Sequence, residues 1–237
     1  MLEVKKISKS IKDKIILDEI NIKVNAGEIY GLLGPNGAGK TTTFYIIAGL
    51  INCESGEINF LNEDISKLPM HKRSQLGIKY LPQESSIFQN LSVYENLLGL
   101  AELSFDNQKD IKKFIDKSIE EFNLSEICDL KGRQLSGGQR RKVEIARTLA
   151  DKPKIILLDE PFAGIDPIAI DDIKNVLKEL SNKNIAVLIT DHNVRETLEI
   201  CNKAAIISNG QILAKGVKEE LINNQLVKKV YLGNMYN

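Results

Sequence analysis

The residues GPNGAGKTT, from Gly34 to Thr42, form the stretch that decides the fold of this 237-residue chain. They match the pattern GxxxxGK[ST], in which glycines let backbone N–H groups close around a phosphate, a lysine reaches the β- and γ-phosphates and a hydroxyl faces magnesium. The apolar run EIYGLL precedes the loop, and TTTFYIIAGL, which has helical character, follows it. This order favours a phosphate-binding loop over an ordinary glycine-rich turn.

The pattern of this loop predicts which residues contact a nucleotide and a metal. We expect Lys40 to reach the β- and γ-phosphates and Thr41 to offer its hydroxyl to Mg²⁺. The expected phosphate-binding set is the whole loop: Gly34, Pro35, Asn36, Gly37, Ala38, Gly39, Lys40, Thr41 and Thr42.

An acidic residue at the end of a second buried strand should help to hold the metal. The stretch KIILLDEP, at 154–161, provides one. We expect Asp159 to hold Mg²⁺ through water, and Glu160 to position and polarise the attacking water. By itself, an apolar strand that ends in Asp-Glu is as consistent with an ordinary pair of carboxylates at the edge of a sheet as with a functional pair. The phosphate loop favours the functional interpretation.

Two further polar residues follow apolar strands. His192 comes after IAVLIT and Asp191, so parallel strands would bring it to the sheet edge of Asp159, where it could donate to the γ-phosphate. Gln83 follows GIKYLP and could give an amide oxygen to Mg²⁺ or to the water. The other histidine, His71, has no such context and is assigned no role.

A second helix start suited to phosphate lies at LSGGQRR, residues 135–141. Ser136, Gly137 and Gly138 place small residues and free N–H groups at a helix N-terminus, which carries about half a positive charge. The chain therefore holds two phosphate cradles, although the first alone is complete.

The remaining pattern predicts an α/β core interrupted by helices. LEVKKI and ILDEINIKV alternate like half-buried strands, whereas KIILLD and IAVLIT are apolar throughout, as in a parallel sheet covered on both faces. Ser92 is a predicted N-cap, and the tail is predicted to be helical with Leu226, Val230 and Tyr231 on one side. The expected divisions are a core over 1–83 and 152–216, a helical subdomain over 84–151 and a helical tail over 217–237.

Composition and charge disfavour several classes of protein. The 32 basic and 32 acidic residues balance, so no global charge indicates nucleic acid or an anionic membrane. Three separated cysteines indicate reduced thiols in a cytoplasm rather than a disulfide framework or a zinc site. The longest apolar run, residues 44–51, is far shorter than the ~20 residues of a membrane-spanning helix. The basic residues Arg140, Arg141 and Lys142 are expected to form a solvated helix face.

Taken together, the motifs resemble those of the ATP-binding cassette (ABC) ATPases. GPNGAGKTT resembles their Walker A motif, LSGGQ their signature, IILLDE their Walker B motif and AGID, at 163–166, their D-loop. Gln83 matches the Q-loop glutamine, and His192 matches the switch histidine. The resemblance implies one ABC ATPase domain over 1–237. It has an α/β P-loop NTPase (RecA-like) core, an N-terminal antiparallel β-subdomain and an inserted α-helical subdomain.

For the second cradle, the resemblance implies a head-to-tail homodimer with two ATP molecules between the copies, and ATP and Mg²⁺ as cofactors. Signature residues of one copy then face the ATP bound by the other. The family often stacks adenine on an aromatic residue where this chain has Ile11, so we expect only apolar packing for the base. Beside the catalytic Glu160 and His192, the residues that the resemblance adds at ATP are Gln83, Ser136, Gly137, Gly138, Gln139 and Asp166.

Within the family, YLPQESSIFQNLSVYENL, LDEPFAGIDPIAI and ITDHNVRETL resemble the ATPases of lipopolysaccharide-export transporters. Such an ATPase is a homodimer on the cytoplasmic face of the inner membrane and drives two integral membrane subunits. FAGIDP and the tail are also similar to branched-chain amino-acid importer ATPases, which are the alternative. The single cassette and neutral charge disfavour a soluble cassette of DNA repair or translation. Glu160 and His192 disfavour a non-hydrolysing regulatory cassette.

The resemblance also places a groove for the membrane subunits beside Ser86 to Leu91, with Phe88 lining it. The alternative is that Phe88 and Leu91 belong to the core of the helical subdomain. No nucleic-acid partner is expected, because no set of stacking aromatic residues accompanies the basic residues 140–142.

Overall fold

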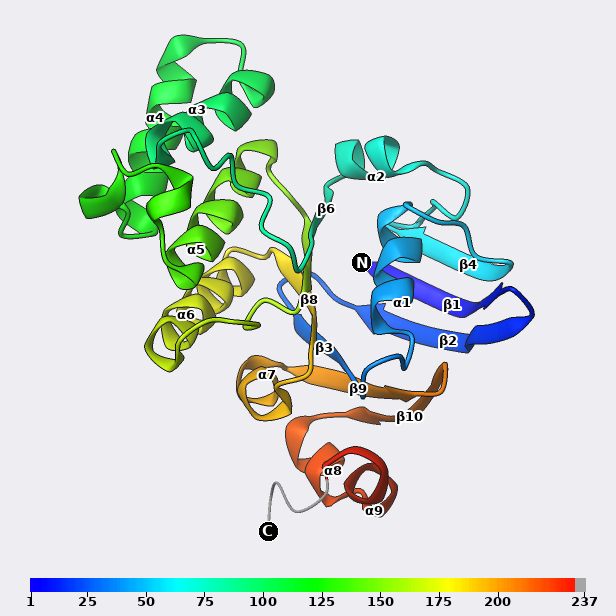
Figure 1. Ribbon diagram of the computed structural model, residues 1–237. Coiled ribbons are helices and arrows are strands. Elements are labelled where there is room, and N and C mark those ends of the chain that lie inside the picture. Colours follow the sequence, from blue (N-terminus) through cyan, green and yellow to red (C-terminus); the bar gives the residue numbers. More distant parts are fainter. Residues whose placement is uncertain (233–237) are drawn as a thin grey trace.

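The computed structural model describes residues 1–232, so residues 233–237 of the predicted tail lie outside the described part. A six-stranded sheet forms the centre, a four-stranded sheet lies beside it, and helices form a separate lobe (Figure 1). This arrangement confirms the predicted fold class, an α/β core with an antiparallel N-terminal sheet and an inserted helical subdomain.

The central sheet has the strand order β10-β9-β3-β8-β7-β6. Neighbouring strands from β9 to β6 are parallel, and only β10 runs antiparallel to its neighbour. A turn at Asn209 and Gly210 joins β9 to β10, with both residues at positive φ. The strands are β3 (Ile29–Leu33), β6 (Ile78–Leu81), β7 (Ile155–Asp159), β8 (Ala186–Asp191), β9 (Lys203–Ser208) and β10 (Gln211–Gly216).

The second sheet is antiparallel throughout, in the order β2-β1-β4-β5. Its two long strands confirm the alternating patterns near the N-terminus. Phe44, Ile46 and Ile47 of the first helix are buried between this sheet and the central one. The strands are β1 (Leu2–Ile11), β2 (Lys14–Val24), β4 (Ser55–Phe60) and β5 (Glu63–Asp64).

Helices pack on both faces of the central sheet, and α3, α4 and α5 form the inserted lobe (Figure 1). Ser92 caps α3 as predicted, because its side chain accepts from the N–H of Glu95 while the Glu95 carboxylate accepts from the N–H of Ser92. No helix within residues 1–232 is both long and apolar enough to cross a membrane. The helices before the tail are α1 (Lys40–Ala48), α2 (Met70–Leu76), α3 (Val93–Ser104), α4 (Gln108–Glu121), α5 (Gly137–Thr148), α6 (Pro167–Asn182) and α7 (Val194–Ile200).

Each inner strand contributes to at least two hydrophobic clusters. In β7, Ile156 and Leu158 pack with α5 and α6, whereas Ile155 and Leu157 pack with α1 and the antiparallel sheet. A strand that is buried on both faces has no position for a solvated side chain. The sequence KIILLD is therefore apolar throughout, unlike the alternating strands of the outer sheet.

The tail is not the single helix predicted from the sequence. It divides into α8 (Lys218–Asn223), α9 (Gln225–Val227) and a short π-helical turn. The break is at Asn224, whose side chain accepts hydrogen bonds from the N–H groups of Leu226 and Val227. Val227 is thereby buried, whereas Leu226 and Val230 are exposed, so the predicted apolar side is wrong.

One buried cation holds α1 to the segment after β5. The Arg73 side chain is 1% exposed and donates to the carbonyl oxygens of Ile46 and Ile47, at the C-terminal end of α1. It also donates to the carbonyl oxygens of Leu68 and Ser66. The last carbonyls of a helix have no partner within the helix, and a cation is the favoured one.

We predict that Arg73→Met lowers the free energy of unfolding by about 3 kcal/mol, because it leaves several buried carbonyl oxygens without a donor. Urea denaturation measures the change. The matched substitution Arg195→Met removes a guanidinium on the exposed side of α7, where its one ion pair within residues 1–232 is the 3.8 Å contact with Glu199. This control should change stability by less than about 0.5 kcal/mol. Equal effects of the two substitutions would contradict the prediction.

Candidate functional site

The phosphate loop lies between β3 and α1, and neighbouring strands fix its shape. A Cβ at Gly34 would lie 2.1 Å from the carbonyl oxygen of Ile207. Gly39 has a φ of +109°, and a Cβ there would lie 2.5 Å from Leu17. Only glycine fits at both positions. The loop then leads into α1, whose first N–H groups have no partner within the helix and suit an anion.

Lys40 is buried inside the loop that precedes it. Its Nζ donates to the carbonyl oxygen of Gly34 at 2.7 Å and to that of Pro35 at 3.1 Å. Burial lowers the pKa of Lys40, and the nearby carboxylates of Glu160 and Asp159 oppose this effect. A phosphate group beside Nζ would stabilise the charged form further. The ammonium is thus held at the position that the sequence predicted for phosphate binding.

Asp159 is buried at the end of β7, where two side chains orient its carboxylate. The Thr190 hydroxyl donates to Oδ1 at 2.5 Å, and the Tyr80 hydroxyl donates to Oδ2 at 3.3 Å. Burial raises the pKa of Tyr80 and keeps that hydroxyl protonated. Neither Thr190 nor Tyr80 was identified from the sequence, because no motif marks them. Only the pairing of β6 and β8 with β7 brings them to Asp159.

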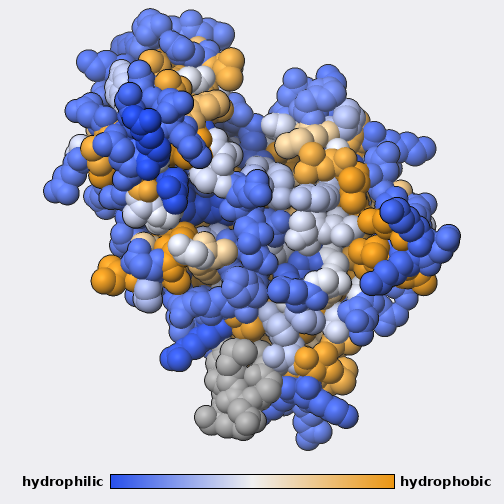
Figure 2. Space-filling view, viewed as in Figure 1, coloured by the Kyte–Doolittle hydropathy of each residue, from blue (hydrophilic) through white to orange (hydrophobic). Residues whose placement is uncertain are grey.

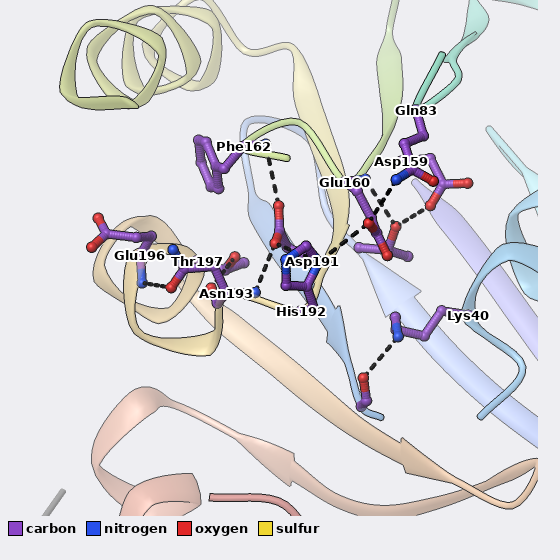
Figure 3. Close-up of polar contacts among 12 residues, drawn as sticks. Lys40, Gln83, Asp159, Glu160, Phe162, Asp191, His192, Asn193, Glu196 and Thr197 are labelled. Carbon is purple, nitrogen blue, oxygen red and sulfur yellow. Dashed lines mark hydrogen bonds and ion pairs between the residues drawn. The ribbon is translucent and has the colours of Figure 1, made fainter. Parts of the chain in front are cut away.

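Glu160 is the point where three predicted site residues meet (Figure 3). Its Oε2 accepts a hydrogen bond from Nε2 of Gln83 at 3.1 Å and lies 3.2 Å from Nδ1 of His192. Its φ is +45°, a left-handed conformation that costs a non-glycine residue roughly 1–2 kcal/mol. The Glu160 N–H donates to the carbonyl oxygen of Thr190 at 2.8 Å, which holds this conformation in place.

Asp191 ties the loops after β7 and β8 together. It is fully buried and accepts hydrogen bonds from the N–H groups of Asn193, at 2.7 Å, and Phe162, at 3.2 Å (Figure 3). Burial raises the pKa of Asp191. The loop that carries Glu160 and the loop that carries His192 are therefore anchored to one carboxyl group.

The predicted catalytic residues and six of the nine predicted phosphate-loop residues line one cleft of about 730 Å³ at the carboxyl edge of the sheet, whereas Gly34, Pro35 and Ala38 do not line it. Ile11 does not line this cleft. The residues that do are Lys14, Ile16, Asn36, Gly37, Gly39, Lys40, Thr41, Thr42, Gln83, Glu160 and His192.

The predicted metal ligands are chemically suited to Mg²⁺. Thr41 and Gln83 line the cleft, and Asp159 lies at the end of β7 beneath Glu160. Hydroxyl, amide and carboxylate oxygens are the hard donors that Mg²⁺ prefers, usually together with waters and substrate phosphates. The Nε2 of Gln83 donates to Glu160, and its Oε1 accepts no hydrogen bond from residues 1–232.

The signature residues do not line the cleft of their own chain. Ser136 and Gln139 form a capping box at the start of α5, with the Ser136 Oγ accepting from the N–H of Gln139 at 3.2 Å. A Cβ at Gly138 would lie 2.4 Å from that of Ala169, so this glycine is also required where α5 meets α6. Asp166 caps α6 by accepting from the N–H of Ala169. The structure therefore separates the two phosphate cradles.

The expectation of a solvated basic face is wrong for Arg141. Its side chain is 5% exposed and donates to the carbonyl oxygens of Pro82, at 3.0 Å, and Asp159, at 3.3 Å. The same guanidinium pairs with the buried Glu144 at 3.0 Å. Arg141 thus links the signature helix to the residues that immediately precede Gln83 and Glu160. Sequence periodicity gave no sign of this, because its partners come from distant strands.

Glu144 completes the link on the other side. Its Oε1 accepts from the Ser85 hydroxyl at 2.8 Å and from the N–H of Ser86 at 2.5 Å. The segment after Gln83 is therefore fixed to α5 by the same ion pair that reaches β7. A rigid displacement of α5 would move both the Gln83 segment and the end of β7.

The amino-acid sequence is similar to that of known proteins. The ABC transporter family profile matches residues 17–163. The lipopolysaccharide export system ATP-binding protein of Haemophilus influenzae is 52% identical over 237 residues, which are 100% of this chain and 98% of that protein. The protein of the same name from Escherichia coli is 48% identical over 233 residues, 98% of this chain and 97% of that one.

The fold also matches solved structures. The ADP conformation of an ATP-binding cassette of an ABC transporter superposes with a TM-score of 0.87 at 31% identity and covers 98% of each chain. The match therefore includes the antiparallel sheet, the central sheet and the helical lobe together.

We predict that Arg141→Leu lowers the free energy of unfolding by about 3–5 kcal/mol, because Glu144 is left as a buried, unpaired carboxylate. The double variant Arg141→Leu/Glu144→Leu removes that charge and should recover part of the loss. Urea denaturation of the two single variants and the double variant gives the coupling energy. Additive effects of the two substitutions would show that the pair has no such role.

Proposed function

Because this chain belongs to the ATP-binding cassette family of ABC transporters, we propose that it is the ATPase subunit of a lipopolysaccharide-export transporter. The observation that carries the cargo assignment is the 52% identity, over the whole chain, to a lipopolysaccharide export ATP-binding protein. Hydrolysis of ATP to ADP and phosphate drives the transport. An ATPase subunit of a branched-chain amino-acid importer is the alternative. We place the protein on the cytoplasmic face of the inner membrane, attached through membrane subunits.

The proposed reaction follows from the charges around the cleft. ATP places its phosphates against Lys40 and the free N–H groups at the start of α1. Glu160 accepts a hydrogen bond from the attacking water, which adds to the γ-phosphorus in line as the bond to the bridging oxygen breaks. His192 donates to a γ-phosphate oxygen. When bound, Mg²⁺ neutralises part of the phosphate charge, held by Thr41, Gln83 and Asp159.

The site requires Glu160 to change partners. Its Oε2 contacts both Gln83 and His192, at 3.1 and 3.2 Å, so both side chains lie within hydrogen-bond distance of the oxygen that we propose for the attacking water. A γ-phosphate would attract the donor groups of Gln83 and His192 and free Oε2 for the water. ATP itself would therefore complete the catalytic arrangement.

We propose a head-to-tail homodimer in which the signature residues of one copy meet the ATP of the other. The support is geometric. Ser136, Gly137 and Gly138 do not line the cleft that contains Lys40, yet they form a helix start suited to an anion. ATP then bridges the two copies, and hydrolysis removes that bridge and opens the dimer.

We predict that Glu160→Gln still binds ATP and forms an ATP-dependent dimer, but hydrolyses ATP at least about 100-fold more slowly, since the carboxylate that activates the water is lost. Phosphate release measures turnover, and sedimentation measures the dimer. The control Glu120→Gln, on the exposed side of α4, should keep the wild-type rate. Near-normal hydrolysis by the Glu160 variant would remove the proposed catalytic role.

For the membrane subunits we propose a groove between the core and the helical lobe. It has a volume of about 310 Å³. Its lining includes Met70 of α2, Leu81 of β6, Phe88 of the segment before α3, Leu100 of α3 and Arg147 of α5. In Figure 2 the surface is hollowed between the lobe of α3 and the part of the core that carries α2. The groove is lined by both the core and the helical lobe, so a bound membrane subunit would contact both of them.

Phe88 is presented to this groove rather than buried in the lobe. Its side chain is 52% exposed, and the Arg147 guanidinium lies 5.4 Å from the ring centre. The buried Asn96 holds the backbone, because its Oδ1 accepts from the N–H of Phe88 at 2.9 Å and its Nδ2 donates to the Phe88 carbonyl oxygen at 3.1 Å. A fixed, exposed aromatic ring is typical of a contact residue.

We predict that Phe88→Ala keeps the ATPase rate of the isolated protein within about twofold but loses the membrane subunits, because an anchor in their groove is gone. Tagged wild-type protein should co-purify with two integral membrane proteins, which mass spectrometry identifies. The control Leu103→Ala removes an 84% exposed side chain at the far end of α3 and should retain them. If the Phe88 variant retained the membrane subunits as well as the wild type does, the proposed groove would be contradicted. If the subunits that co-purify with the wild type belong to an amino-acid importer, the alternative function is the correct one.

A further inference from the structure

A second cleft lies at the opposite end of β3 from the phosphate loop. It has a volume of about 450 Å³, within the range of small-molecule sites. It shares no residue with the nucleotide cleft, and β3 separates the two. Its lining comes from β1, β2, the start of β3, β9 and β10: Glu3, Val4, Lys5, Asn21, Ile22, Lys23, Asn25, Tyr30, Lys203, Lys215 and Gly216.

Positive charge is concentrated in this cleft although the whole chain has a net charge of zero. Lys5 and Lys23, on the neighbouring strands β1 and β2, share one carboxylate. Their Nζ atoms lie 3.2 and 4.0 Å from the oxygens of Glu3. One negative charge therefore serves two ammonium groups on this side.

The opposite side of the cleft is similar. Lys203 lies 3.8 Å from Glu28, whose carboxylate also accepts from the N–H and side-chain amide of Asn25. Lys215 has no ion pair among residues 1–232. The lining of the cleft thus contains four lysines and one carboxylate, Glu3, while Glu28 pairs with Lys203 from outside the lining, so positive charge exceeds negative charge there.

A tyrosine hydroxyl also reaches the cleft. Tyr30 is only 4% exposed and lines the cleft, and its hydroxyl has no hydrogen-bond partner in the described part of the chain. Burial raises the pKa of Tyr30 to about 12, so the hydroxyl is protonated at neutral pH and can donate.

We propose that this cleft binds a small phosphate monoester, with its dianionic phosphate paired with the lysine ammonium groups and accepting a hydrogen bond from Tyr30. A phosphate monoester carries close to two negative charges at neutral pH, which suits a cleft with an excess of lysines. The remaining part of the molecule would contact Asn21, Asn25 and the apolar surface of Ile22. Because the two clefts are separate, ATP and this ligand can be bound together.

Isothermal titration with glycerol 3-phosphate tests the site, using the full chain with its nucleotide cleft saturated by ADP. Saturable binding to one site per chain is expected. Lys203→Gln/Lys215→Gln should weaken it at least tenfold, and Tyr30→Phe should weaken it severalfold. Lys112→Gln/Lys113→Gln, which removes two equally exposed charges from α4, should leave it unchanged.

The contrary outcomes are distinct. No saturable binding of glycerol 3-phosphate or of phosphate-headgroup vesicles would overturn the proposal. Equal weakening by the two double variants would do the same, because it would reduce the effect to net charge. Equal binding of unphosphorylated glycerol would also overturn it.

A second arm separates a soluble ligand from a lipid headgroup. Vesicles that contain phosphatidic acid are compared with vesicles of phosphatidylcholine alone. Binding only to phosphatidic acid vesicles, lost in Lys203→Gln/Lys215→Gln, would support the site with a lipid as the source. Binding of glycerol 3-phosphate without vesicle binding would support a soluble ligand. The melting temperature of each variant confirms that it is folded.

Discussion

The parallel pairing of β3, β8 and β7 is the interaction on which the nucleotide site depends. Its register sets Leu33 opposite Asp191 and Asp159 opposite Thr190, so that the three strands end together. Backbone hydrogen bonds thereby bring the phosphate loop, Asp159, which we propose as a metal ligand, and His192 to one edge. A slip of the register would separate them, since each side chain comes from a different strand.

The burial of charged groups at this edge gives the site its chemistry. Lys40 is enclosed by carbonyl oxygens, and Asp159 and Asp191 are held by hydroxyl and N–H donors. Such groups are oriented before a substrate arrives, and in a medium of low polarity they act strongly on phosphate charge. Glu160, in a strained conformation, is the one carboxylate whose partners, Gln83 and His192, are themselves ligands for ATP in the proposed mechanism.

The ion pair of Arg141 and Glu144, on α5, connects the helical lobe to the nucleotide site. Arg141 and Glu144 join α5 to the backbone beside Gln83 and Asp159, and Arg147 reaches the segment that carries Phe88. One helix therefore carries the signature residues at its start and contacts the proposed membrane-subunit groove at its end. Movement of the lobe relative to the core would therefore change the positions of both the proposed groove and Glu160, the proposed catalytic carboxylate. This arrangement gives a physical route between transport and hydrolysis.

The amino-acid sequence by itself determined the local elements of this protein. The phosphate loop, the strands of either pattern, the Ser92 cap and the Asn209-Gly210 turn each depend on residues close together in the chain. It also placed Lys40, Gln83, Glu160 and His192 in one site, because parallel strands end at a common edge. The tertiary structure alone decided which polar groups are buried. Arg73, Arg141, Tyr80 and Thr190 gave no signal in the sequence, since each has at least one buried partner on a segment distant in the chain. The break at Asn224 likewise depended on how the tail packs. A cation can be buried only where carbonyl or carboxylate oxygens surround it, and folding decides where those oxygens meet.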